Sequence, residues 1–236
     1  MLNLRVTVLE KFRRFIDNVS EYETEESLME TLTGVFTGNE YTRIGTAFHK
    51  IVECGFEPNL EIFGKDVCHV VVDNFGVLFN QSHIDMALAY KESIKGCFHE
   101  IRANKVYSVN GTNINISGGA DVILGNQIRD IKTKYSYLKS IADYTDSFQW
   151  KLYCDIFELP EFYFDIFEFQ GYNKEKNGYD VSGLTLKKHD PIPCLVYSTM
   201  QSDIQYLLTE FLAFIKFKNI EHLFTEIKTN NYEPKH

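Results

Sequence analysis

Residues 118–133 read GGADVILGNQIRDIKT, and this stretch decides how the rest of the chain is interpreted. Gly125 and Asn126 form a dipeptide typical of two-residue hairpin loops, with apolar residues on both sides. Counting outward from that loop places Asp121 directly opposite Asp130. Side chains opposed in this way have Cβ atoms roughly 4.5–5.5 Å apart, and like charges there destabilise a sheet. A divalent cation between the two carboxylates is the simplest reason for the pair.

The residues beside Asp130 extend this candidate metal site. Strand alternation puts Asp130 and Lys132 on one face and turns Ile131 away from it. Carboxylate oxygens that leave several positions to water suit Mg²⁺ or Mn²⁺. The alternative is an exposed hairpin whose charges point into solvent. We take Asp121, Asp130 and Lys132 as the candidate catalytic residues.

A helix is predicted over residues 41–55, because apolar residues recur there at helical spacing. His49 lies on the flank of the apolar stripe, where its ring can reach inward as a third candidate metal ligand. Gly45, one turn earlier, leaves room for another element or a ligand. Glu53, one turn later, is a candidate partner for His49 or a surface charge. A partly buried histidine that binds no metal is the alternative for His49.

A second helix is predicted over residues 146–159, with Pro160 as its stop. Gln149 and Tyr153 are four residues apart and therefore lie on one face of this helix. Both carry hydrogen-bonding groups that can face a site. The alternative is a core tyrosine and an exposed glutamine.

The chain of 236 residues is predicted to be a single α/β domain. Residues 1–100 read as mostly helical, and residues 101–236 as a sheet core with the hairpin and a closing helix. Further predicted helices lie near residues 8–15, 82–99 and 204–215. Further predicted strands lie near residues 112–117, 162–170, 179–188 and 194–197.

Composition excludes several classes of protein. No apolar run approaches the roughly 20 residues that cross a bilayer, so no membrane association is expected. The five cysteines form no C-x-x-C pair and read as buried, reduced thiols. A reducing compartment follows, namely the cytoplasm of a bacterial or host cell. The net charge of −9 argues against broad nonspecific nucleic-acid binding, so any DNA must be held by a local patch.

Four short motifs follow one another along the chain. They are Gly45-Thr-Ala-Phe-His49, Gly118-Gly-Ala-Asp121, Ile128-Arg-Asp130-Ile-Lys132-Thr133 and Gln149-Trp-Lys-Leu-Tyr153. This ordered series resembles the RecB-like branch of the PD-(D/E)XK nuclease superfamily. The resemblance spans about residues 43–153. Ala120 stands where the superfamily has proline, and the cysteines do not match the iron–sulfur members, so the resemblance is to cluster-free, stand-alone nucleases.

The resemblance implies a restriction-endonuclease-like fold, a mixed β-sheet flanked by helices. It implies a DNA nuclease dependent on Mg²⁺ or Mn²⁺, with an exonuclease as the expected kind, acting in recombination, repair or phage replication. A recombination protein is a possible partner. The implied metal ligands are His49, Asp121, Asp130 and the carbonyl of Ile131, and Lys132 would orient the attacking water. Substrate binding or bracing of the site is implied for Arg43, Thr133, Lys134, Tyr135, Gln149 and Tyr153.

Residues just beyond the catalytic strand are further candidates for phosphate contact and base stacking. Besides Lys134 and Tyr135, they include Tyr137 and Lys139, and a solvated loop is the alternative. Two other functions stay open: a DNA- or protein-binding module without catalysis, and a metal-dependent phosphoesterase acting on small nucleotides. Strand preference, polarity, exonuclease or endonuclease action and oligomeric state also stay open.

Overall fold

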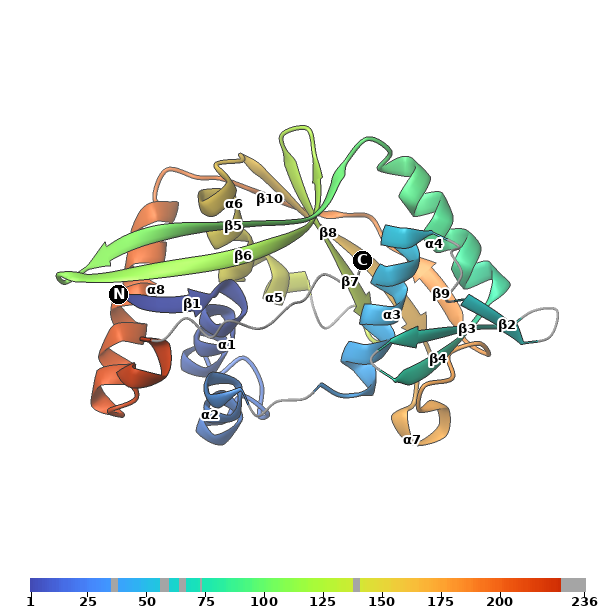
Figure 1. Ribbon diagram of the computed structural model, residues 1–236, viewed down its shortest axis with the longest axis horizontal. Helices are drawn as coiled ribbons and strands as arrows, with labels where there is room; N and C mark the ends of the chain where they lie inside the picture. The colour runs from blue at the N-terminus through green and yellow to red at the C-terminus, as the bar shows by residue number, and fades with distance from the viewer. Residues whose placement is uncertain (35–37, 56–59, 64–66, 73, 138–140, 226–236) are drawn as a thin grey trace.

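A mixed β-sheet runs through the centre of the molecule (Figure 1). The computed structural model describes residues 1–34, 38–55, 60–63, 67–72, 74–137 and 141–225. Within that part of the chain the sheet has seven strands, with the path β1-β6-β7-β8-β10, β5 beside β6 and β9 beside β8. These strands are β1 (Leu2–Arg5), β5 (Phe98–Val109), β6 (Thr112–Leu124), β7 (Gln127–Lys134), β8 (Glu161–Gln170), β9 (Thr185–Lys188) and β10 (Ile192–Leu195).

Helices cover both faces of this sheet. One face carries α1 (Val6–Ile16), α2 (Glu25–Thr33), α5 (Ile141–Thr145), α6 (Phe148–Phe157) and α8 (Met200–Phe217). The other carries α3 (Glu40–Cys54), α4 (Gln81–Ser93) and a small antiparallel sheet of β2 (Leu60–Phe63), β3 (Val67–Val72) and β4 (Phe75–Asn80). The short helices α7 (Lys174–Asn177) and η1 (Glu221–Phe224) complete the described elements.

The core is divided by the sheet into two layers. Along β8, Phe164 and Ile166 belong to the cluster under α1, α6 and α8, whereas Phe167 and Phe169 belong to the cluster under α3 and α4. This division follows from strand alternation. Because β8 is buried on both faces, apolar residues occupy both of them, and six of its ten residues are hydrophobic.

The hairpin predicted at Gly125 is confirmed. Leu124 pairs with Gln127 and Val122 with Arg129 across a two-residue loop, in which Gly125 has φ +61°. The ladder ends at Val122–Arg129, one pair short of the two aspartates. Nearer the start of β6, at Ile114–Ser117, the edge that faces β7 at the hairpin pairs with β1 instead. The other edge of β6 pairs with β5.

The expected pair of directly opposed aspartates is therefore not part of a regular ladder. The strands β6 and β7 separate where Asp121 and Asp130 lie. Four residues earlier along β6, at Ile114–Ser117, β1 is the strand that pairs with it. This separation leaves backbone groups of β7 without partners on β6, and side chains take their place.

The predicted fold class, a mixed β-sheet core flanked by helices, is confirmed. The predicted helices correspond to α1, α3, α4, α6 and α8. The N-terminal 100 residues hold four helices but also β1, the small sheet and the start of β5, which we did not predict. The five cysteines are free; three are buried, Cys97 is partly buried and, contrary to expectation, Cys54 is exposed. Among the described residues, no helix is long and apolar enough to cross a membrane.

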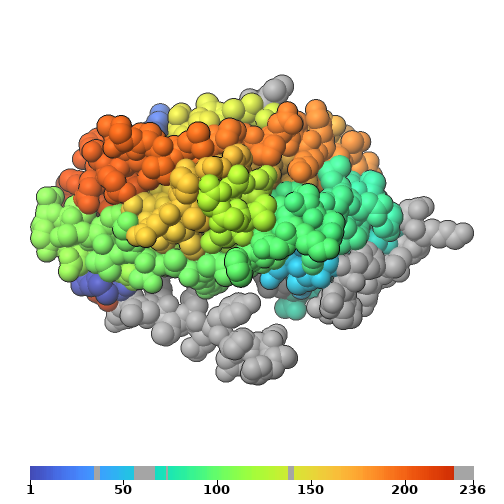
Figure 2. Space-filling view, turned by 90° about the horizontal axis from the view of Figure 1, so that it is seen from above, coloured from blue at the N-terminus to red at the C-terminus, as the bar shows by residue number. Residues whose placement is uncertain are grey.

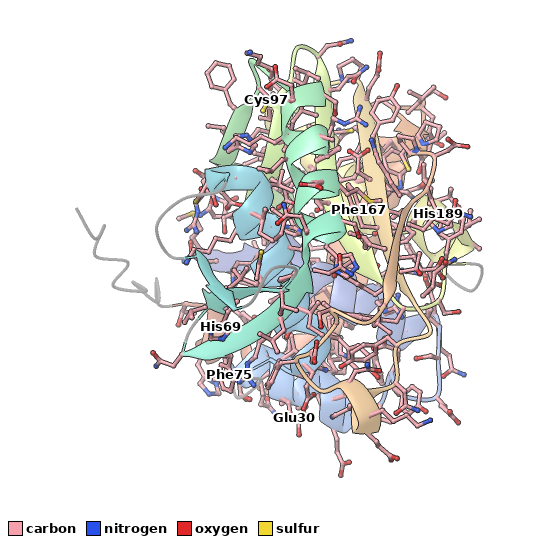
Figure 3. The ribbon with its side chains drawn as sticks, turned by 90° about the vertical axis from the view of Figure 1, so that its right-hand side faces the viewer. Glu30, His69, Phe75, Cys97, Phe167 and His189 are labelled. Carbon is pink, nitrogen blue, oxygen red and sulfur yellow. The ribbon has the colours of Figure 1, made fainter. Side chains whose placement is uncertain are left out.

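Two further views place the outer elements. Figure 2 shows the green surface of the β5–β6 pair running beside the orange-red surface of α8, and these elements are in contact. In Figure 3, His69 and Phe75 lie on the small sheet, and His189 lies on the opposite side of Phe167. The small sheet therefore stands apart from the end of β9.

Candidate metal and catalytic site

His49 reaches β7 because α3 packs closely against that strand. A capping box between Asn39 and Thr42 begins the helix. A Cβ atom at Gly45 would lie 2.8 Å from Oγ1 of Thr133, so glycine permits this approach. One turn later, Nε2 of His49 lies 2.7 Å from the carbonyl oxygen of Ile131. Since a carbonyl only accepts, Nε2 is the donor in this bond.

Asp121 joins His49 to β7 at the point where the strands separate. Its Oδ2 accepts a hydrogen bond of 2.9 Å from the backbone N–H of Ile131, in place of a ladder bond from β6. The same oxygen lies 3.6 Å from Nδ1 of His49. Groups from α3, β6 and β7 thus lie together at this point.

Asp130 lies beside this group and is buried, with 4% of its surface exposed. Its Oδ1 accepts a hydrogen bond of 3.0 Å from Nε2 of Gln149, and its Oδ2 is 2.7 Å from Nζ of Lys132. That second contact is a buried ion pair, in which the ammonium of Lys132 also offers the carboxylate a hydrogen bond. Burial raises the pKa of Asp130 to about 6, although Lys132 opposes the shift.

The pKa of Asp130 makes the stability of the metal-free protein depend on pH. Because the folded value of about 6 exceeds the ordinary value near 4, the ionised carboxylate destabilises the fold. This penalty is absent below about pH 4 and grows as the pH rises from about 4 to about 6, above which it is fully present. We expect Asp130→Asn to raise the melting temperature in EDTA at pH 7.5 and to leave it unchanged at pH 4. An equal difference at both pH values would contradict the raised pKa.

Gln149 and Tyr153 are carried by α6, whose first turn is held by acceptors from two elements. Ser147 caps the helix, and Glu10 of α1 accepts from the backbone N–H of Phe148 at 2.8 Å. Tyr153 is buried and stacks on Phe162 with ring centroids 5.9 Å apart. Burial raises the pKa of Tyr153 to about 12, so its hydroxyl stays protonated at neutral pH.

The ring of Tyr153 lies against Gly118, which gives the second motif glycine a steric role. A Cβ atom at Gly118 would lie 2.4 Å from Cε1 of Tyr153, whereas one at Gly119 would meet only Cγ of Arg102, at 3.7 Å. We expect Gly118→Ala to destabilise the protein by about 1–3 kcal/mol, since the ring must shift. The matched Gly119→Ala variant should change stability by less than about 0.5 kcal/mol in urea unfolding. Equal effects of both changes would refute this packing role.

Other sequence candidates lie outside the cluster of acids. Arg43 stacks over Phe75 at 3.4 Å and donates to the hydroxyl of Tyr179. Tyr135 packs on Tyr172, with ring centroids 4.5 Å apart. Both belong to an aromatic patch at the start of α3.

The remaining candidates are distributed as follows. Among the described residues no hydrogen bond or ion pair joins Glu53 to His49, and the carbonyl of Glu53 instead accepts from Lys91. Tyr137 stacks on His189, with ring centroids 3.7 Å apart. Lys134 follows Lys132 on β7, and Lys139 lies outside the described residues.

Glu100 is a neighbour of the site that the sequence did not reveal. The ladder between β5 and β6 pairs His99 with Val122 and Ile101 with Ala120, which leaves Glu100 beside Asp121 with φ +52°. The side chain is exposed, but partial desolvation raises the pKa of Glu100, and the charges of Asp121 and Glu53 add to the shift. Only the register of β5 could have indicated this residue.

The donors of the cluster suit a hard divalent ion. His49 Nε2 and the Ile131 oxygen are 2.7 Å apart and joined by a hydrogen bond, so Nε2 would have to lose that proton to bind an ion. Oδ2 of Asp130 is a buried acceptor that faces Nζ of Lys132 at 2.7 Å, so an ion bound there would compete with that pair. As they stand, however, no three described His, Cys, Asp or Glu side chains are placed to hold a metal. Ion binding therefore requires the Asp130 carboxylate to turn away from Lys132.

Comparison with known proteins does not identify a family. No protein-family model and no curated protein matches the chain. Among solved structures, the chain is similar to SSO0001, with 14% identity, a TM-score of 0.44 and coverage of 91% of this chain and 76% of that one. It is also similar to a phage-related exonuclease from Haemophilus somnus 129PT, with 12% identity, a TM-score of 0.45 and coverage of 91% and 96%.

Proposed function

We propose that this chain is a single-domain, divalent-metal-dependent DNA nuclease, with recombination, repair or phage replication as its setting. One observation carries the proposal. Side chains from four separate motifs meet where β6 and β7 separate: His49 and Asp121 at 3.6 Å, Asp130 and Lys132 at 2.7 Å, and Gln149 and Asp130 at 3.0 Å. A buried carboxylate whose pKa is raised by burial is costly in the metal-free fold and is typical of a functional site.

The proposed ligands of one Mg²⁺ or Mn²⁺ ion are Asp121, Asp130, His49 and the Ile131 carbonyl. Such an ion supplies a bound water of lowered pKa and shields the charge of the phosphate. Lys132 orients the attacking water and offsets negative charge at the scissile phosphate. Gln149 holds the Asp130 carboxylate through its hydrogen bond, and Tyr153 keeps α6 seated on Gly118.

A cleavage assay with end-labelled DNA tests this proposal. Single- and double-stranded oligonucleotides and a panel of nucleotides are incubated with the protein and Mn²⁺, and with EDTA as the control. We expect metal-dependent shortening of the oligonucleotides. Absence of cleavage across these DNA forms would favour a binding module, and hydrolysis confined to the nucleotides would favour a small-molecule phosphoesterase.

A further inference from the structure

Lys134 lies two residues beyond Lys132 along β7. Alternate residues of a strand share a face, so Lys134 lies on the face of Asp130 and Lys132. Unlike Lys132, it forms no ion pair with a carboxylate of any described residue. Burial lowers the pKa of Lys134 to about 8, and the like charges of Lys132 and Arg14 add to the shift. Lys132, Lys134 and Arg14 therefore act on one another here, and Asp130 and Asp143 offset part of their charge.

Tyr144 of α5 lies against this lysine. Its ring centroid is 4.9 Å from Nζ of Lys134, a cation–π distance, and the residue is 7% exposed. Its hydroxyl is buried without a hydrogen-bond partner among the described residues. The charges that act on this hydroxyl include those of Lys132, Asp130 and Arg14, so it lies close to the candidate site. An unpartnered buried hydroxyl lowers stability unless a ligand or water completes it.

We propose that Lys134, Tyr144 and Arg14 bind the DNA phosphate next to the scissile one. The Cα atoms of Lys132 and Lys134 are about 6.6 Å apart along the strand, comparable to the spacing of successive phosphates in DNA. Lys134 donates to the phosphate and the Tyr144 hydroxyl gains an acceptor. Arg14 keeps its pairs with Glu23 at 2.7 Å and with Asp143 at 3.4 Å, which hold its guanidinium in place. The inference rests on the proposed function and specifies its substrate: a polynucleotide, since a mononucleotide has no second phosphodiester.

A chemical scan of the DNA tests this site without requiring cleavage. Oligonucleotides with one neutral methylphosphonate at successive linkages are titrated with the protein in Ca²⁺, and affinity is followed by fluorescence anisotropy. At one linkage of the series, the one that lies in the proposed site, we expect the wild type to lose about tenfold in affinity. Lys134→Met should bind unmodified DNA about tenfold more weakly and lose nothing further at that linkage. Lys216→Met, which removes an exposed lysine on α8, should behave as the wild type.

Tyr144→Phe separates a binding role from a structural one. Since the hydroxyl has no partner in the described chain, its removal should leave the melting temperature unchanged or raise it, yet lower DNA affinity several-fold. Wild-type affinity in both variants, or an equal methylphosphonate penalty in wild type and Lys134→Met, would overturn this inference alone. DNA binding with the expected scan but no cleavage in Mn²⁺ would overturn the nuclease proposal and support the phosphate site. Absence of DNA binding by the wild type would overturn both.

Discussion

Asp130→Asn is expected to lower the rate of Mn²⁺-dependent DNA cleavage by about 10³-fold, a loss typical of removing one charged group that stabilises a transition state. The asparagine keeps the size of the side chain and an oxygen that can accept from Gln149. It removes the negative charge that pairs with Lys132 at 2.7 Å and that would bind the ion. Rates are measured on an end-labelled oligonucleotide at saturating Mn²⁺.

A matched control separates this effect from a general loss of charge. Asp85 is an exposed aspartate of α4 that accepts a hydrogen bond from Gln81, and Asp85→Asn should cleave at the wild-type rate. The melting temperature of metal-free Asp130→Asn at neutral pH should not fall, because burial of the ionised carboxylate is unfavourable. Retention of more than about a tenth of the wild-type rate would remove Asp130 from the proposed site.

Arg129→Met is expected to cost about 3–5 kcal/mol of unfolding free energy, the largest effect that we predict on stability. Arg129 projects from the other face of β7 and binds Asp165 of β8 with two hydrogen bonds, of 2.7 and 2.8 Å. Asp165 is fully buried, and its remaining partner is the hydroxyl of Tyr90 at 2.7 Å. Loss of the guanidinium leaves a buried carboxylate without its counter-charge. The loss is measured by urea unfolding, and in a thermal melt it should lower the melting temperature by about 10 °C.

Two further variants show whether the charge or the packing is responsible. Replacing both partners, as Arg129→Met with Asp165→Leu, should recover most of the lost stability, because no unpaired charge remains. Lys218→Met breaks a pair with Glu25 that is 2.6 Å long but lies at the surface, and it should cost less than about 1 kcal/mol. If Arg129→Met and Lys218→Met were equally mild, the buried pair would not stabilise the sheet as we expect.

Local signals in the sequence were sufficient for the elements that carry the site. The hairpin followed from its two-residue loop, and α3 and α6 followed from helical spacing and a stop signal. His49, Asp130 and Gln149 lie on these three elements, so their approximate placement followed from signals in the sequence close to each residue.

Elements that depend on distant pairing could not be read in the same way. The strand β5 is exposed at most positions and shows no clear apolar alternation, so only its pairing with β6 defines it. The strand β1 has four residues, too few for a periodic signal. The separation of β6 and β7 beyond Val122 has no signal in the sequence, so the hydrogen bond between Asp121 and the Ile131 N–H could not be foreseen. The same limit concealed Glu100, which depends on β5, and Tyr144, which depends on the packing of α5.

Anomalous diffraction from crystals grown with Mn²⁺ tests the central claim most directly, since it locates the ion without relying on catalysis. We expect one strong peak where β6 and β7 separate, within bonding distance of Asp121, Asp130, His49 and the Ile131 oxygen, with Lys132 no longer paired to Asp130. A map with no peak between these strands, in which Asp130 remains paired with Lys132, would contradict the account.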